Sequence, residues 1–175
     1  MLALAPGWMR LFLHLAVDLA LRHGTILRLT PAAWSKANDA ITFVTKNQVQ
    51  QTLPLTPEVR ALLELAPAPG LQAVQQLKGS SKPVTPEVIE RAWQKLKAAA
   101  QANPQLTIHD LRRTAAEQAW NATHDLRRVQ FLLGHASIAT TAHYLARRAD
   151  LSNLRETVQA MQDTRGQRHG ASQTP

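Results

Sequence analysis

Residues 109–148 read HDLRRTAAEQAWNATHDLRRVQFLLGHASIATTAHYLARR, and they carry the most informative residues of the chain. A His-Asp-Leu-Arg-Arg segment opens the stretch at His109, and a Leu-Leu-Gly-His segment ends at His135. Tyr144, the only tyrosine of the protein, follows both, and the chain has no cysteine. Tyr144 is therefore one of few candidate nucleophiles. Arginine and histidine side chains that converge on one hydroxyl group are suited to attack on a phosphodiester.

The same stretch predicts helices at about 110–121, 126–133 and 138–147, because its apolar residues recur at helical spacing. Upstream, Thr-Pro-Glu segments at Thr56 and Thr85 are start signals of two more helices, since threonine caps the first turn and proline fits the first position. The second of these helices is expected to end near Ala102, before Asn103-Pro104. Most of the chain is therefore predicted to be helical.

The first part of the chain predicts a helix from Trp8 to Arg22, broken at Gly24, and a short second helix from Ile26 to Leu29. β-Branched and aromatic residues over 39–45 predict a strand that turns at Asn47-Gln48 and pairs with a second strand at 50–55. The fold class that follows is mainly α with a small antiparallel β-sheet.

The domain organisation predicted is one domain over 1–165 and a disordered tail over 166–175. Residues 66–81, rich in proline, glycine and serine, are expected to connect its helices, with a turn of helix at 72–77. A last amphipathic helix is expected at about 150–161 and is a candidate for docking on a neighbouring subunit or on its own domain.

The charge favours a polyanionic partner. The formal net charge is +8, and residues 150–175 hold three basic and three acidic residues, so the excess belongs to the body of the domain. Nucleic acid is the expected partner, ahead of an anionic membrane surface. The absence of cysteine excludes disulfides and thiol catalysis and fits an intracellular protein.

The apolar start of the chain is predicted to be a core helix. It has no basic residue before its apolar run, and Arg10, His14 and Asp18 interrupt it, which argues against an export signal. No uninterrupted apolar run is long enough to span a bilayer, so we expect no membrane partner and a cytoplasmic location.

Several segments resemble the tyrosine recombinases, the phage-integrase family, over about residues 8–160. The segments His109 to Thr114 and Leu133 to Thr141, with Tyr144, resemble the catalytic region of the family. Leu19 to Leu29, around Arg22, resembles its first arginine box, and Thr45-Lys46 with Leu53-Pro-Leu55 resembles its β-hairpin lysine. The resemblance implies a tyrosine recombinase catalytic-domain fold.

The resemblance also implies a mechanism. Tyr144 would attack a DNA phosphate and form a 3′-phosphotyrosyl link, while Arg22 and Arg112 would neutralise the charge that develops on the phosphate oxygens. The bond energy stays in the phosphotyrosine, so neither a metal nor a nucleotide cofactor is expected.

Three further residues complete the implied catalytic set. Lys46 would protonate the leaving 5′-oxygen, His109 would take the tyrosine proton, and His135 would hydrogen-bond the phosphate. A structural interpretation stands beside each assignment: a solvated hairpin lysine for Lys46, a helix cap for His109 and a turn residue for His135.

The predicted function is site-specific DNA recombination by a homotetramer on double-stranded DNA, in the nucleoid of a bacterial or phage-derived system. The alternative is an inactive or truncated integrase remnant that acts only as a DNA-binding module; a topoisomerase-like phosphodiesterase is a third reading. Family members usually carry an N-terminal DNA-binding domain, so a separate domain or accessory protein is a candidate partner.

Two local features modify the resemblance. His124 to Arg128 repeats the sequence of His109 to Arg113, but only the first copy has the spacing before Leu-Gly-His that is found in the family. The second copy is predicted to be a solvated basic helix face near the DNA backbone. Thr25 stands where the family usually has an acidic residue, and the segment after Lys46 lacks the usual glycine and basic residues.

Overall fold

The computed structural model of the chain describes residues 1–45, 48–65 and 84–146. The helices are α1 (Gly7–Val17), α2 (His23–Arg28), α3 (Pro57–Leu65), α5 (Pro86–Ala99), α6 (Ile108–Thr123), α7 (Leu126–Leu133) and α8 (Ile138–Ala146), with short 3-10 turns at Leu2–Leu4 and Pro31–Ala33. The strands β1 (Trp34–Ser35), β2 (Ala40–Val44) and β3 (Gln50–Pro54) form one antiparallel sheet in the order β1-β2-β3. The predicted fold class is confirmed.

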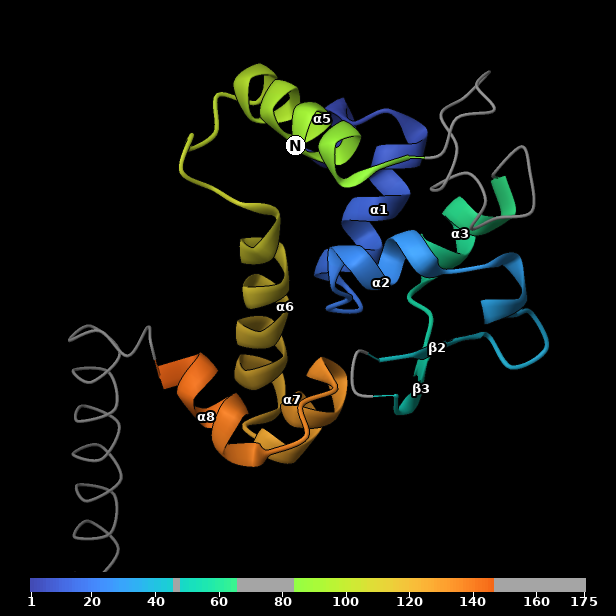
Figure 1. Ribbon diagram of the computed structural model, residues 1–175, viewed down its shortest axis with the longest axis vertical. Coiled ribbons are helices and arrows are strands. Elements are labelled where there is room, and N and C mark those ends of the chain that lie inside the picture. The colour runs from blue at the N-terminus through green and yellow to red at the C-terminus, as the bar shows by residue number, and fades with distance from the viewer. Residues whose placement is uncertain (46–47, 66–83, 147–175) are drawn as a thin grey trace, which may run out of the picture.

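The larger core surrounds α1, which packs against α2, α3 and α6 (Figure 1). Its side chains come from α1, α2, α3 and α5 and from both longer strands, and the largest fully buried ones include Met9, Phe12, Leu15, Ile26, Ile41, Leu63, Ile89 and Trp93. Full burial of one such side chain stabilises the fold by about 1.5–3 kcal/mol. This core fixes the sheet and α2 relative to α6.

A second, smaller core joins α6, α7 and α8. Ala20, Ala115, Ala116, Val129 and Leu133 are buried there, and Tyr144 is among the partly buried side chains packed against them. The small alanine side chains bring the backbones of α6 and of the α1–α2 connection close together. The helix that carries Tyr144 is thus held to α6 through α7.

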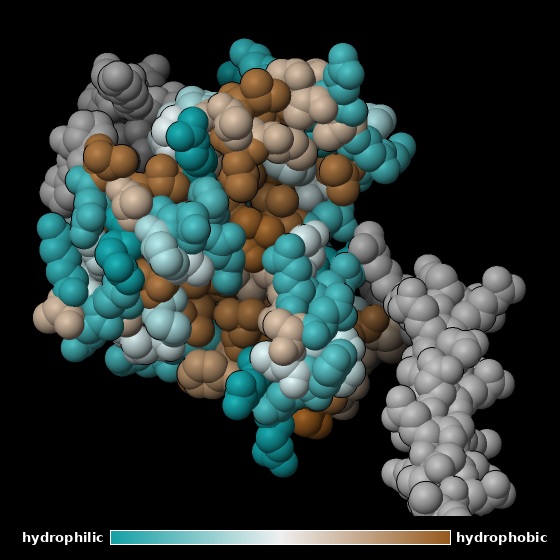
Figure 2. All heavy atoms as spheres, turned by 180° about the vertical axis from the view of Figure 1, so that it is seen from behind, coloured by the Kyte–Doolittle hydropathy of each residue, from teal (hydrophilic) through white to brown (hydrophobic). Residues whose placement is uncertain are grey.

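Part of the apolar surface remains exposed. In the view of Figure 2, apolar side chains gather along the middle of the molecule, between polar flanks. Val44, Val49, Phe131 and Ile138 are among the large apolar side chains that stay exposed. No helix in the described ranges is long and apolar enough to cross a membrane.

The end of α1 differs from the prediction. The helix ends at Val17, not at Arg22, and Gly24 lies inside α2. The carboxylate of Asp18 binds His14 Nδ1 at 2.8 Å and accepts a hydrogen bond from Thr56 Oγ1 at 3.2 Å, and Ala20 takes the left-handed φ of 53°. These contacts turn the chain, so Arg22 becomes the N-cap residue of α2.

The connection from α5 to α6 is held by two buried side chains. Lys97 Nζ donates to the carbonyl oxygens of Pro104 at 2.6 Å and Leu106 at 2.8 Å, and Trp93 Nε1 donates to Leu106 at 3.0 Å. Asp110 then accepts from the backbone N–H of Thr107 at 2.9 Å, which caps α6. The first turn of α6 therefore has a fixed start.

We expect Lys97→Met to destabilise the protein by about 1–3 kcal/mol. The substitution leaves the Pro104 carbonyl without its charged donor and leaves the Leu106 carbonyl with Trp93 as its remaining side-chain donor. Urea denaturation followed by circular dichroism measures the change. Lys95→Met on the exposed face of the same helix is the control and should leave the midpoint unchanged. Equal midpoints for both variants would contradict the structural role of Lys97.

Candidate active site

The candidate site lies where the start of α2, the first turns of α6, the α7–α8 turn and α8 meet. The residues placed together there are Arg22, His109, Arg112, His135 and Tyr144, all predicted from the sequence. A cavity of about 310 Å³ is lined by Arg22, His109 and Arg112. The rings of His109 and His135 contact the Tyr144 ring edge to face, with centroids 5.9 and 5.7 Å away. Lys46 lies outside the described residues.

Arg112 is buried at the centre of the site, with 4% of its surface exposed. Its Nη1 donates to the carbonyl of Ala20 and its Nη2 donates to the carbonyl of Leu133. Burial, and then the nearby charge of Arg22, lowers the pKa of Arg112 to about 10, so the guanidinium is still positive at neutral pH. An arginine has five N–H donors, so donors remain for an anion in the cavity that it lines.

His135 is oriented by a buried hydroxyl group. Its Nδ1 lies 3.0 Å from Oγ1 of Thr141, which is fully buried. Gly134 precedes it with a φ of 57° at the end of α7 and so turns the chain towards α8. Burial, followed by the charges of Arg112 and Arg22, lowers the pKa of His135 to about 4. The ring is therefore neutral at neutral pH.

The hydroxyl group of Tyr144 is buried and has no hydrogen-bond partner within the described ranges. The guanidinium of Arg113 lies 5.9 Å from its ring centroid. Burial raises the pKa of Tyr144 above its usual value of 10, against the opposing effect of Arg112 and Arg113. The resting side chain is a neutral phenol, which needs a base before it can attack.

His109 is a second histidine whose ring contacts that of Tyr144. Burial, and then the charges of Arg112 and Arg113, lowers the pKa of His109 below its usual 6.5. The ring is therefore neutral and able to accept a proton. The neighbouring Asp110 caps α6 and binds Arg113 Nη1 at 3.1 Å.

Gln51, which we did not predict, ties the β2–β3 hairpin to the site. Its side chain is 6% exposed, and its Nε2 donates to the carbonyls of Phe131 and, at 3.4 Å, Leu132. The hairpin thus lies beside α7 (Figure 1). Alternation along β3 buries Gln51 and Leu53 on one face, and a polar residue on a buried strand face was the signal available in the sequence.

Thr45, directly before Lys46, is buried and lines a second cavity of about 370 Å³ together with Gln51, Gly134 and His135. The residue that precedes the predicted catalytic lysine is therefore next to the histidine turn. Thr25 is buried as well and lines the first cavity beside Arg22 and Arg112. A neutral hydroxyl group there leaves the positive charge of the arginines uncompensated.

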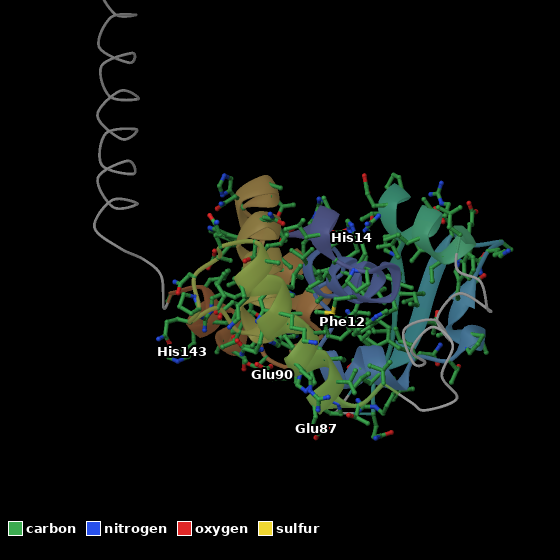
Figure 3. All side chains as sticks on the ribbon, turned by 90° about the horizontal axis from the view of Figure 1, so that it is seen from above. Phe12, His14, Glu87, Glu90 and His143 are labelled. Atoms are coloured by element: carbon green, nitrogen blue, oxygen red, sulfur yellow. The ribbon has the colours of Figure 1, made fainter. Side chains whose placement is uncertain are left out.

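Two other histidines are exposed and are not part of this cluster. His143 is exposed at the outer end of α8, away from Phe12 and His14 of α1 (Figure 3). His124 is exposed too, and its ring packs on Trp120. Across the described residues, no group of three or more histidine, aspartate or glutamate side chains is arranged to hold a metal ion.

Comparison with known proteins relates the chain to one family. Residues 3–150 match the family model described as "Phage integrase family". The chain is 35% identical over 144 residues to the tyrosine recombinase XerC of Methylobacterium sp. (strain 4-46), a match that covers 74% of this chain and 44% of the relative. It is 31% identical over 137 residues to XerC of Agrobacterium fabrum, covering 75% and 44%. The chain thus spans less than half the length of these curated relatives.

Solved structures show the same fold. The XerA recombinase matches with a TM-score of 0.71 and 22% identity, covering 89% of this chain and 57% of the solved one. The XerH site-specific recombinase bound to a palindromic difH substrate, a post-cleavage complex, matches with a TM-score of 0.68 and 21% identity, covering 87% and 45%. The fold is therefore that of a tyrosine recombinase catalytic domain.

We expect Gly134→Ala to destabilise the protein by about 1–2 kcal/mol from its left-handed backbone alone, with a further cost because the added Cβ would lie 2.7 Å from Gln51 Oε1. Combined with Gln51→Ala, the loss should be smaller than the sum of the two single losses, since the clash is gone. Urea denaturation of the four proteins measures this coupling.

Gly7→Ala is the matched control, because an added Cβ there meets nothing within 4 Å. Strictly additive losses for Gly134→Ala and Gln51→Ala would contradict the contact between the hairpin and the histidine turn.

Proposed function

The chain belongs to the phage integrase family, and we propose that it is a site-specific recombinase that cleaves and rejoins double-stranded DNA through a 3′-phosphotyrosyl intermediate. One observation carries the proposal: the only tyrosine has its hydroxyl group buried without a partner in the described ranges, beside two histidines of lowered pKa. An unpaired buried hydroxyl costs folding free energy. Such a cost is expected where the group serves a reaction.

In the first step, Tyr144 Oη attacks the scissile phosphorus and forms a phosphotyrosyl ester, while the bond from phosphorus to the 5′-oxygen breaks. His109 accepts the phenolic proton. Its ring contacts the Tyr144 ring, and its lowered pKa keeps it neutral at neutral pH. Attack by a second strand's 5′-hydroxyl reverses the step and restores the tyrosine, so the two strands are exchanged without a nucleotide cofactor.

Arg22 and Arg112 stabilise the transition state. Both line one cavity, and each lies close enough to lower the pKa of His135. Two like charges held together in a partly buried site are unfavourable without an anion. A phosphate whose non-bridging oxygens gain charge relieves that repulsion most in the transition state, which is the condition for catalysis.

His135 and Lys46 complete the reaction. In the neutral tautomer whose Nδ1 accepts a hydrogen bond from the hydroxyl group of Thr141, the proton of His135 is on the other ring nitrogen, which can donate to a phosphate oxygen. We assign Lys46 as the acid that protonates the leaving 5′-oxygen. In support, the residue before it lines the cavity that also contains His135.

The partner is double-stranded DNA, in agreement with the net charge of +8 and with the substrate-bound state of XerH. We propose a homotetramer on DNA, with residues 1–165 as the catalytic domain and DNA contacts added by an N-terminal DNA-binding domain or an accessory protein. The reaction would take place in the cytoplasm, at the nucleoid.

The test uses DNA duplexes of random sequence that carry a nick. Cleavage near the nick releases a short fragment, and once this fragment is lost its 5′-hydroxyl can no longer reverse the reaction, so the covalent adduct is trapped. We expect wild-type protein to retain DNA under denaturing conditions, with the adduct mapped to Tyr144 by mass spectrometry. Tyr144→Phe should abolish the adduct, by at least about 10³-fold, and leave DNA binding by mobility shift unchanged. His143→Ala on the same helix should form the adduct normally.

Adduct formation by Tyr144→Phe would show that another residue is the nucleophile. Binding of DNA by the wild-type protein without any adduct, even with a DNA-binding domain of a relative supplied in trans, would favour a binding module instead of an enzyme.

The rate of adduct formation should fall only below the usual histidine pKa of 6.5. The sign follows from the base: as the pH falls through the lowered pKa of His109, the ring takes up a proton and can no longer accept one from Tyr144. Single-turnover rates measured from about pH 5 to 8 locate this acidic limb of the pH–rate profile, where the rate falls. His135, with a pKa of about 4, stays neutral in that range.

His109→Asn keeps a hydrogen-bonding side chain but removes the base, so the limb should disappear and the remaining rate should be low and flat. The same limb in this variant would show that another group takes the proton.

A further inference from the structure

The second cavity, of about 370 Å³, contains an arginine that the reaction described above does not use. It lies between the β2–β3 hairpin and α7, and its lining includes Thr45, Gln50, Arg127, Gln130, Phe131 and His135. The first cavity, with Arg22 and Arg112, does not include His135 among its lining residues. Basic side chains are therefore found in two neighbouring cavities of the site.

The side chain of Arg127 has no bonded partner in the described ranges, whereas the side chain of the neighbouring Arg128 has one. The backbone N–H groups of both residues donate to Asp125 Oδ1, which caps α7. Arg128 also pairs through Nε with Asp125 Oδ2 at 3.3 Å, whereas the exposed guanidinium of Arg127 makes no hydrogen bond or ion pair with a described residue. An unpaired guanidinium in a cavity wall is free to bind an anion.

The two cavities are neighbours across a small void. A small void of about 10 Å³ is lined by Arg22, Arg112, Thr45 and Gln51; the first two residues also line the first cavity and the last two also line the second. The two cavities therefore lie on either side of this void, and the second is the neighbouring position for a phosphate of the same strand. Along one DNA strand, successive phosphates follow at about 3.4 Å of helix rise.

We propose that this second cavity binds the DNA backbone phosphate next to the scissile one, with Arg127 as its charged ligand. The proposal rests on the proposed function, since it places the scissile phosphate at Arg22 and Arg112. Among the described lining residues, the guanidinium of Arg127 is free to pair with a phosphate there, and the exposed amide of Gln50 lines the same cavity. Held at two successive phosphates, the strand cannot slide past Tyr144.

A protein partner is the competing occupant, because Phe131 and Val49, 62% and 59% exposed, flank the same cavity. The charge favours the phosphate: the chain carries a net charge of +8, and the described residues that line the cavity include an arginine and no acidic residue. Apolar side chains at the edge of the cavity are compatible with the sugar faces of a DNA strand.

The experiment compares Arg127→Gln with Arg128→Gln in the full chain. Both variants lose one charge from the same helix turn, but only Arg127 lines the cavity. Binding of a fluorescent duplex is measured across a salt series. We expect the slope of log K against log salt to fall by about one for Arg127→Gln and by much less for Arg128→Gln. Circular dichroism checks that both variants are folded.

A second measurement locates the phosphate. At cleavage positions recovered from the covalent adducts, a neutral methylphosphonate replaces one flanking phosphate at a time. Replacement of the phosphate next to the scissile one should weaken wild-type binding several-fold and leave binding by Arg127→Gln unchanged. Equal weakening of both proteins would overturn the assignment.

Equal salt slopes for Arg127→Gln and wild type, with adduct formation intact, would overturn the cavity proposal alone. A lowered slope with no adduct from wild type would overturn the proposed recombinase reaction and still support binding of the DNA backbone at Arg127. If Phe131→Ala breaks an oligomer while Arg127→Gln leaves the salt slope unchanged, the cavity is a protein contact and the proposal fails.

Discussion

The site depends on the two hydrogen bonds that the buried guanidinium of Arg112 donates to the carbonyls of Ala20 and Leu133. A buried cation is costly unless such partners compensate it, and the end of a helix offers carbonyls that lack an intrahelical donor and attract positive charge. Leu133 is the last residue of α7, and Gln51 of the hairpin binds the two carbonyls before it. One helix end therefore holds α6, the α1–α2 connection and the sheet together, and Arg22 and His135 each lie two residues from a carbonyl that Arg112 binds.

Burial also sets the protonation states of the residues around Arg112. The same desolvation that lowers the pKa of Arg112 lowers the pKa of both histidines and raises that of Tyr144. At neutral pH the two histidines and the tyrosine are neutral, whereas Arg22 and Arg112 are charged, so the resting site is a positive cavity next to neutral proton donors and acceptors. Such a site favours an anion before any proton moves. The neutral Thr25 beside Arg22 and Arg112 adds no negative charge to oppose it.

Local signals in the sequence were sufficient for most elements and insufficient for contacts between distant segments. The threonine caps before α3 and α5 and the span of α7 are local, and they were predicted within a few residues. The end of α1 was not, because Ala20 takes its left-handed conformation where it meets Arg112, 92 positions further along the chain. Gln51 was missed for the same reason: its partners lie 80 and 81 positions away. The catalytic set came from resemblance to a family, and only the coordinates show that Tyr144 lies between two histidines.

The repeated His-Asp-Leu-Arg-Arg segment shows how a cap decides the role of a residue. In the first copy Thr107 is the N-cap of α6, so Asp110 is the third helical residue and Arg112 the fifth. In the second copy Asp125 is itself the N-cap, so Arg127 is only the second helical residue of α7. The five identical residues therefore present different faces: Arg112 points into the core and binds carbonyls, whereas Arg127 remains open beside His135, where a phosphate is the partner that its charge and exposure favour.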